Sequence, residues 1–178
     1  VGLSDLDVSA PMKSLQGPLF RRGESADVVR DGAGKIKVHY RVSRNPLVSI
    51  IIPTKDRWDM LRQCIKSVES VTRYPSYEIV VVDNGSRTAK AKEYLSTLSK
   101  KWIIHRFPGP FNFSEINNYG ASKANGEFLL FLNDDTQVIA PEWMSAMVAQ
   151  AQRTGVGAVG AKLLYPSGMI QHAGVVLG

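Results

Sequence analysis

The chain has 178 residues, of which 44% are hydrophobic and 21% charged, and these values suit one globular domain with a core of ordinary size. Its apolar runs are much shorter than the ~18–20 residues that a membrane span requires, so we predict no spanning helix. The net charge of +6 is compatible with an anionic ligand, but the basic side chains are scattered, which argues against a nucleic-acid-binding surface.

The first 45 residues are poorer in apolar runs than the rest of the chain. Residues 1–34 mix Gly, Ser, Asp and Arg without a sustained period, so we expect a loop or a partly disordered leader there. Residues 35–42, KIKVHYRV, alternate polar and apolar side chains at period two, which predicts a half-exposed strand. Residues 1–45 are therefore expected to form a leader or linker, and residues 46–178 the main domain.

From Pro46 onward, strand patterns alternate with helix patterns. The expected strands cover 48–52, 77–82, 103–105 and 127–132, with two further candidates at 156–165 and 169–177, and the expected helices cover 58–71, 90–98 and 114–124, with a last one beginning at Pro141. Asp56 and Ser114 are the predicted N-caps of the first and third helices. This alternation predicts an α/β fold with a mostly parallel central sheet flanked by helices.

Several reactive or aromatic side chains fit structural roles. Cys64 recurs in register with the apolar residues of the first helix, so we interpret it as a buried core thiol. His172 lies in an apolar alternating pattern and is interpreted as a structural histidine. Phe107, Phe111 and Phe113 stand among prolines and a glycine, a setting that favours anchoring of a loop over sugar binding.

Polar clusters follow three of the predicted strands, at Thr54–Arg57, Asp83–Ser86 and Asn133–Thr136. The carboxyl ends of parallel strands meet at one edge of the sheet, where such folds bind their ligands. We therefore expect the three clusters to lie together in space.

The third cluster contains two adjacent carboxylates, Asp134 and Asp135, after a buried strand. Adjacent acids could merely cap a turn, but a second acid at Asp83, on a neighbouring strand end, favours a site for a divalent cation and a diphosphate. Because side chains alternate along a strand, Asn133 and Asp135 should point together and Asp134 elsewhere.

Three runs of the sequence resemble a known family: PLVSIIIPTKDR, YEIVVVDNGS and INNYGASKANGEFLLFLNDDTQV. Together, in this order and spacing, they resemble the Rossmann-like nucleotide-diphospho-sugar transferase (GT-A) fold of the inverting family-two glycosyltransferases. That family includes cellulose, hyaluronan and many O-antigen and rhamnosyl-type transferases. The resemblance extends from Pro46 to about Gly178. The family's sequence pattern continues beyond the position that matches residue 178.

The resemblance implies roles for individual residues. Asp83 matches an acid that accepts a hydrogen bond from the base, which favours uracil or thymine, and Gly120 matches a close-packing position. The implied nucleotide-binding residues are Pro53, Thr54, Asp56, Asp83, Asn118 and Asp134. Pro53 and Thr54 match the segment around the base, and Asn118 a helix start beside the nucleotide.

The implied metal ligand is Asp135, the last acid of the family's Asp-X-Asp motif, and the implied cofactor is Mn²⁺ or Mg²⁺. Asn133 replaces the first acid of that motif and brings no negative charge. We therefore expect weak metal affinity without nucleotide. Lys55 and Arg57 fit phosphate contacts or solvated loop charges equally well.

The activity implied by the resemblance is transfer of a sugar, with inversion, from a UDP- or dTDP-sugar to a glycan or lipid-linked acceptor. The catalytic base of such proteins lies beyond the position matching residue 178, so we expect this chain to bind donor and metal but to be poorly active alone. The N-terminus lacks the layout of a secretory signal, which predicts a cytoplasmic location, and peripheral association with a membrane is compatible with it.

Two other functions stay open. A sugar-phosphate nucleotidyltransferase shares the general architecture, but it places a glycine-rich basic loop where this chain has PTKDR. A non-catalytic glycan- or protein-binding module on the same fold would bind no nucleotide. A Rossmann oxidoreductase is excluded, because no G-x-G-x-x-G follows a predicted strand.

Overall fold

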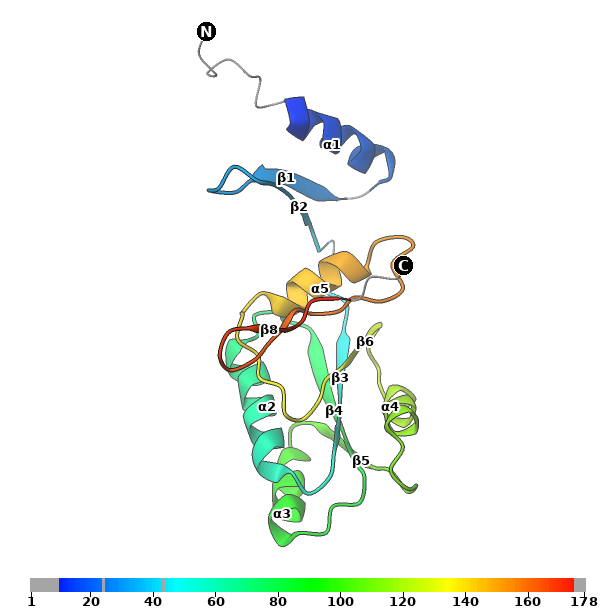
Figure 1. The fold of residues 1–178 in the computed structure, drawn as a ribbon. Helices are drawn as coiled ribbons and strands as arrows, with labels where there is room; N and C mark the ends of the chain where they lie inside the picture. Colours follow the sequence, from blue (N-terminus) through cyan, green and yellow to red (C-terminus); the bar gives the residue numbers. More distant parts are fainter. Residues whose placement is uncertain (1–9, 24, 43, 175–178) are drawn as a thin grey trace. The chain divides into compact units, whose positions relative to one another are not determined.

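The computed structural model describes residues 10–23, 25–42 and 44–174 (Figure 1). The chain divides into two compact units, one formed by Val1–Arg44 with Ser145–Gly178 and the other by Asn45–Met144. We call them unit 1 and unit 2, respectively. Within the described residues, no helix combines the length and apolar character needed to cross a membrane.

Unit 2 is built on a four-stranded parallel sheet with the order β5-β4-β3-β6. Its strands are β3 (Val48–Thr54), β4 (Tyr77–Asp83), β5 (Ile103–Arg106) and β6 (Phe128–Phe131). In the register of β3, Thr54 pairs with Asp83 of β4, and Ile51 pairs with Phe131 of β6. The predicted α/β fold with a parallel central sheet is confirmed.

Three helices cover the two faces of this sheet. They are α2 (Trp58–Val71), α3 (Ala89–Leu98) and α4 (Phe113–Ala121). The chain steps outward from β3 to β4 to β5 and then returns past β3 to β6, so right-handed crossovers place α2 and α3 on one face and α4 on the other (Figure 1). The reversal between β3 and β6 opens a crevice at the carboxyl ends of these strands, where such sheets bind ligands.

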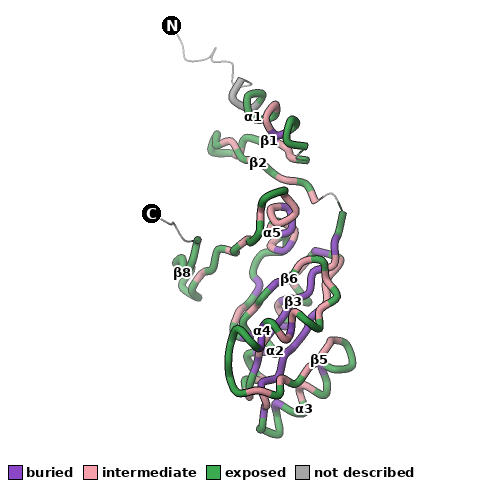
Figure 2. Tube along the Cα trace, turned by 90° about the vertical axis from the view of Figure 1, so that its right-hand side faces the viewer, coloured by how far each residue is buried: buried purple, intermediate pink, exposed green. Residues whose placement is uncertain are grey.

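The core of unit 2 lies along the two central strands, which appear as buried segments in Figure 2. Ile50–Ile52 of β3 and Val80–Val82 of β4 are fully buried, because helices cover both faces. Each such side chain stabilises the fold by about 1.5–3 kcal/mol. Cys64 of α2 is 1% exposed, which confirms its prediction as a core residue.

Two glycines allow close approach of neighbouring elements. A Cβ atom at Gly120 of α4 would lie 2.6 Å from Cγ2 of Ile51 and 2.9 Å from Cγ2 of Val82, which confirms the predicted close-packing position. A Cβ atom at Gly126 would lie 2.5 Å from Oγ of Ser49. The absence of a side chain at these two positions lets α4 pack closely on the sheet and lets the chain before β6 pass close to Ser49.

Several local predictions in unit 2 are wrong. The strand predicted over 48–52 does not end before Pro53 but continues to Thr54. Ile51 O accepts from Leu132 N, so Ile51 and Pro53 face the side of β6. The pairing with β6 ends at Ile51, so the missing N–H of Pro53 costs no ladder bond. Asn112, rather than Ser114, caps α4 by accepting from Glu115 N.

The third correction concerns β6, which is not fully buried. Leu129 is 45% exposed and Phe131 is 54% exposed. β6 pairs with β3 alone and therefore forms an edge of the described sheet. An apolar run does not reveal which strand takes the edge.

Unit 1 contains more regular structure than predicted. Helix α1 (Ala10–Arg21) lies against β1 (Ala26–Arg30), which pairs antiparallel with β2 (Ile36–Tyr40). The strand predicted at 35–42 is confirmed by β2, but the loop predicted over 1–34 is wrong for 10–21 and 26–30, and 1–9 lie outside the described residues. Pro18 inside α1 obscures the helical pattern, and the helix, in which Leu19 is buried, is stabilised by its packing against β1 rather than by propensity.

The C-terminal strands are shorter than predicted. Helix α5 (Trp143–Ala151) begins two residues after Pro141, and within the described part of the predicted strands only β7 (Leu163–Leu164) and β8 (Ile170–His172) form, as an antiparallel pair. Residues 175–177 of the predicted last strand lie outside the described residues. His172 is exposed, so its interpretation as a structural residue in an apolar strand is wrong.

Candidate functional site

A cavity of about 280 Å³ lies at the carboxyl ends of β3, β4 and β6, where the strand order reverses. Its lining residues are Pro53, Thr54, Lys55, Arg57, Asn84, Phe111, Phe113, Ile116, Asn133, Asp134 and Asp135. Each of the three polar clusters contributes to this lining. The prediction that they lie together is confirmed.

The turn from β3 into α2 is held by Asp56, which adopts the left-handed conformation with a φ of 58°. Its N–H donates to Oγ of Ser86 over 2.9 Å, and its carboxylate accepts from Arg87 N at 2.7 Å and Thr88 N at 2.9 Å. The N–H groups of Thr88 and Arg87 lower the pKa of Asp56. Asp56 thus fastens this turn to the start of α3 instead of capping α2, which corrects the predicted N-cap, and it lies outside the cavity lining.

Asp83 and Asn84, at the end of β4, face different surroundings. Oδ1 of Asp83 accepts from Ser86 N over 2.8 Å, and this buried carboxylate is not part of the cavity lining. Asn84 is part of it, and its Nδ2 donates to Gly109 O over 3.1 Å. Asn84 is only 5% exposed, and its Oδ1 has no hydrogen-bond partner within the described structure.

The orientation of the Asn84 amide follows from that contact. The carbonyl of Gly109 can only accept, so the amide nitrogen must face it and the oxygen must be the free atom. A buried acceptor without a partner costs about 1–3 kcal/mol. A ligand that donates a hydrogen bond into the cavity would remove this cost.

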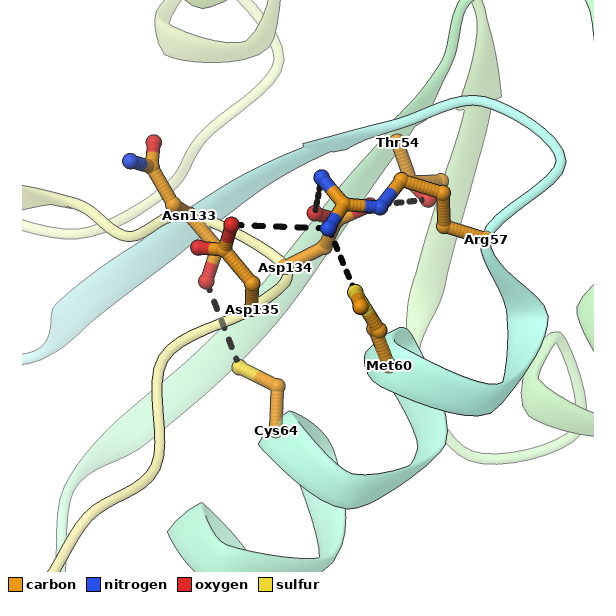
Figure 3. A network of polar contacts seen from close by, with 7 residues as sticks. All are labelled: Thr54, Arg57, Met60, Cys64, Asn133, Asp134 and Asp135. Atoms are coloured by element: carbon orange, nitrogen blue, oxygen red, sulfur yellow. Dashed lines mark hydrogen bonds and ion pairs between the residues drawn. The ribbon is translucent and has the colours of Figure 1, made fainter. Parts of the chain in front are cut away.

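The opposite end of the cavity is charged (Figure 3). Thr54 Oγ1 donates to Asp134 over 2.8 Å, and the two terminal nitrogens of Arg57 lie 3.5 Å from Asp134 and 3.5 Å from Asp135. The Asp134 side chain is 8% exposed and that of Asp135 is 50% exposed. Asn133 and Asp135 are exposed and Asp134 is buried, but Asp134 and Asp135 both face Arg57 and both line the cavity, so the prediction that Asp134 points elsewhere is wrong. The strand ends at Phe131, and its alternation of side chains does not extend to these residues.

The surroundings of Asp134 act on its charge in opposite directions. Burial raises the pKa of Asp134, and the hydroxyl of Thr54 and the guanidinium of Arg57 oppose that effect. A buried carboxylate needs a partner of this kind to remain ionised. Arg57 is therefore the counterion of this end of the cavity.

These residues fit a metal ion only if water and a bound substrate supply its other ligands. The described residues contain no group of three or more His, Cys, Asp or Glu side chains that could hold a metal. Burial, together with the charges of Asp134 and Asp135, raises the pKa of Cys64 to about 12, so its thiol stays neutral. Two adjacent carboxylates fit Mg²⁺ or Mn²⁺, which bind one or two carboxylates and complete their shell with water and substrate phosphates.

We call the end of the cavity at Asn84 the neutral end and the end at Asp134 and Asp135 the charged end. An aromatic segment, residues 107–113, borders the neutral end. Phe107 packs edge-to-face on Tyr119 at 5.6 Å and is an anchor, as predicted. Phe111 and Phe113 are 70% and 50% exposed and line the cavity, so the anchoring prediction is wrong for them. Nδ2 of Asn117 donates to Phe113 O over 2.8 Å and helps to hold the segment.

The predicted nucleotide-binding residues thus divide into two groups. Pro53, Thr54 and Asp134 line the cavity together with Asp135, whereas Asp56, Asp83 and Asn118 do not. Asn118 is exposed in the middle of α4 rather than at its start. Sequence reasoning missed Asn84, although its position directly after the last residue of β4 could have drawn attention to it.

The sequence matches a known family over most of its length. The sequence model described as "Glycosyl transferase family 2" matches residues 49–175. The chain belongs to this glycosyltransferase family. It is 44% identical over 179 residues to "O-antigen biosynthesis protein RfbC" of Myxococcus xanthus, a match that covers 98% of this chain and 14% of that protein. It is 30% identical over 130 residues to "Glycosyltransferase AglE" of Haloferax volcanii, covering 69% of this chain and 42% of that protein.

A solved structure shares the fold of this family-2 chain. The mannosyltransferase PcManGT from Pyrobaculum calidifontis, solved in complex with GDP-Man and Mn²⁺, superimposes with a TM-score of 0.62 at 18% identity. The match covers 90% of this chain and 47% of that one. The GT-A fold is therefore confirmed. The chain spans well under two thirds of the length of these relatives.

Proposed function

We propose that this family-2 chain binds a nucleotide-diphosphate-sugar donor in the cavity and supports transfer of the sugar to an acceptor hydroxyl. The supporting observation is the unequal chemistry of the two ends of one cavity. One end carries the Asp134–Asp135 pair with Arg57, and the other carries the free Asn84 acceptor beside exposed phenyl rings. A nucleotide diphosphate is unequal in the same way, with a charged end and a flat hydrogen-bonding ring.

The charged end would receive the diphosphate and a divalent cation. Asp135 is the better metal ligand of the two acids because it is half exposed, whereas Asp134 is buried against Thr54. Mn²⁺ or Mg²⁺ held there would neutralise the developing charge of the leaving nucleoside diphosphate. Lys55 and Arg57 both line the cavity, Arg57 at this end, and would contact phosphate oxygens.

The neutral end would receive the base. Oδ1 of Asn84 would accept a hydrogen bond from a ring N–H, which uracil and thymine carry at N3 and guanine at N1, whereas cytosine and adenine carry no such N–H. Phe111 and Phe113 would contact the base or sugar through their exposed faces. The uracil or thymine preference inferred from Asp83 stays a prediction.

The finer features of the reaction are proposals that rest on family membership. They are inversion at the transferred sugar, a glycan or lipid-linked acceptor, and a catalytic base beyond residue 178. The similarity to a protein named for O-antigen biosynthesis supports a polysaccharide acceptor. The chain covers 14% of that relative, so the activity of a complete protein is also a proposal.

Calorimetric titration of UDP, dTDP, GDP, CDP and ADP, with and without Mn²⁺, tests the proposed donor site. We expect UDP, dTDP and GDP to bind more tightly than CDP and ADP, and Mn²⁺ to strengthen binding. Asn84→Ala should remove most of the base preference, roughly 5- to 100-fold for one buried hydrogen bond. Asn117→Ala is the matched control, because Asn117 also holds the aromatic segment but does not line the cavity.

Each rival function predicts a different result. Failure of all five nucleotides to bind, with or without Mn²⁺, would reject the donor site and favour a non-catalytic module. Tight binding of a nucleoside triphosphate with formation of a nucleotide sugar from a sugar phosphate would favour a nucleotidyltransferase. Equal loss of base preference in the Asn84→Ala and Asn117→Ala variants would assign the preference to the aromatic segment instead of Asn84.

A further inference from the structure

A cation of the protein itself sits between the two acids of the charged end. Arg57 reaches Asp134 with one terminal nitrogen and Asp135 with the other, each over 3.5 Å (Figure 3). A divalent ion held by both carboxylates would need the same space and the same oxygen atoms. Metal binding and the Arg57 bridge therefore compete.

The turn before α2 aims the Arg57 side chain at these acids. Asp56 is locked in the left-handed conformation by its contacts with Ser86, Arg87 and Thr88. The backbone of Arg57 is thus fixed, while its side chain is 47% exposed and also touches Met60 Sδ. A fixed backbone with a long, half-exposed side chain allows the guanidinium to change partners without moving the fold.

The charges explain why Arg57 would leave only under certain conditions. One guanidinium faces two carboxylates, and Asp134 is almost fully buried, so loss of Arg57 alone would leave a buried charge without a counterion. A divalent ion can replace it at Asp134 and Asp135. The released guanidinium then needs a new anionic partner, and a diphosphate offers one with suitable geometry for two parallel hydrogen bonds.

We propose that Arg57 is a positioning residue that bridges Asp134 and Asp135 in the free chain and moves to the donor's diphosphate when a divalent cation takes its place. The inference rests on the proposed donor site. Its consequence is coupling: without nucleotide, the cation must displace Arg57 into water, whereas with nucleotide Arg57 regains an ion pair. Because coupling is reciprocal, the cation strengthens nucleotide binding by the same factor.

A thermodynamic cycle measures this coupling directly. The dissociation constant of Mn²⁺ is measured from the paramagnetic resonance signal of the free ion, with and without saturating UDP, for the unchanged chain and for Arg57→Gln. The ratio of the two constants is the coupling factor. We expect Arg57→Gln to bind Mn²⁺ alone roughly threefold to tenfold more tightly, the range for losing two partly exposed ion pairs, and its coupling factor to fall by a similar amount.

Two further variants separate this exchange from a general change of charge. Arg57→Lys keeps the charge but cannot present two nitrogens to two carboxylates, so its coupling factor should be intermediate. Arg73→Gln removes an exposed arginine that pairs with Glu142 and does not line the cavity, so both its Mn²⁺ affinities should match the unchanged chain. Far-UV circular dichroism verifies that each variant folds.

Two results would overturn the exchange. In the first, Arg57→Gln tightens Mn²⁺ binding equally with and without UDP, which leaves the coupling factor unchanged and reduces Arg57 to a background charge. In the second, Arg57→Gln weakens Mn²⁺ binding in the absence of UDP. By contrast, if the unchanged chain binds neither UDP nor GDP in the presence of Mn²⁺, the proposed donor site itself fails, and the exchange fails with it.

Discussion

The two ends of the cavity would meet a ligand in different ways. At the charged end the groups already have partners in the chain. Asp134 accepts a hydrogen bond from Thr54, and Arg57 forms ion pairs with both Asp134 and Asp135. A ligand there must exchange one set of contacts for another. At the neutral end the oxygen of Asn84 has no partner within the described residues, so a ligand adds a contact. If the donor binds as proposed, the neutral end would set selectivity for the base and the charged end would set the coupling between cation and nucleotide.

The largest expected effect breaks the charged end while preserving the fold. Asp135→Ala should remove most of the strengthening of nucleotide binding by Mn²⁺, at least roughly 10- to 100-fold, because loss of a group that only supports a metal ligand already has this effect and Asp135 is the proposed ligand itself. The Asp135 side chain is 50% exposed, so the free energy of unfolding should change by less than about 0.5 kcal/mol. Titration calorimetry of UDP with and without Mn²⁺, beside urea unfolding, measures both.

The companion variant Asp134→Asn should show the reverse pattern. Asp134 is buried and accepts from Thr54, so the change should lower the free energy of unfolding by about 1–3 kcal/mol. Its effect on the Mn²⁺ dependence should be smaller than that of Asp135→Ala. If Asp134→Asn alone abolished the Mn²⁺ dependence, the assignment of Asp135 as the principal ligand would be wrong.

A smaller effect is expected where the neutral end is supported by α4. Gly120→Ala would place a Cβ atom against two fully buried side chains of the sheet, Ile51 and Val82, which cannot move without disturbing the core. Overpacking of this kind costs about 1–3 kcal/mol of unfolding free energy. The base preference should weaken with it, since α4 carries Phe113 and Ile116 into the cavity lining.

Gly157→Ala is the matched control for this change. An added Cβ atom there meets no described atom within 4 Å, so the unfolding free energy should stay within about 0.5 kcal/mol of the unchanged chain. Equal stability losses in the two variants would show that the contact with Ile51 and Val82 is not what makes Gly120 necessary.

The central sheet and α2 could be predicted from the sequence because their signals are local. Buried parallel strands give continuous β-branched runs, as in 48–52, and α2 keeps four buried side chains at helical spacing over 14 residues. The edge position of β6 is a property of the topology, so its apolar run was misread as buried. Helix α1 was missed because Pro18 opposes helix formation and the stabilising contact with β1 is tertiary.

The site shows the same division. Polar residues at the ends of parallel strands must converge, and this rule placed Thr54, Asp134 and Asp135 correctly beside one cavity. The directions of the Asp83 and Asn84 side chains depend on the turn after β4. There Asp83 accepts a hydrogen bond from Ser86 N, and Asn84 lines the cavity. Strand periodicity does not extend into such turns, so it could not choose between the two residues.

The smallest expected effect concerns Glu78 near the start of β4, which holds the approach to β6 at the opposite end of the strands from Asp134 and Asp135. Its carboxylate accepts from Ser49 Oγ at 2.6 Å and from the backbone and side chain of Asn125 at 2.7 and 3.0 Å. Burial alone would raise the pKa of Glu78, but these hydrogen bonds, with one from Gly126, lower it below 4.5. Glu78→Gln should therefore cost about 1 kcal/mol of unfolding free energy at pH 7.

The pH dependence of that loss gives a second reading. A carboxyl whose pKa is lowered by folding adds stability above its unfolded value of 4.5, and this contribution is lost as the pH falls through the lower, folded value. Urea unfolding of the unchanged chain and of Glu78→Gln should thus differ at pH 7 and converge in the acid range below 4.5. The control is Glu93→Gln, at an exposed position on α3, and its free energy of unfolding should stay close to that of the unchanged chain at pH 7. A difference that persisted unchanged into acid would mean that the shape of the Glu78 side chain, and not its charge, supports the strand that delivers Asp134 and Asp135.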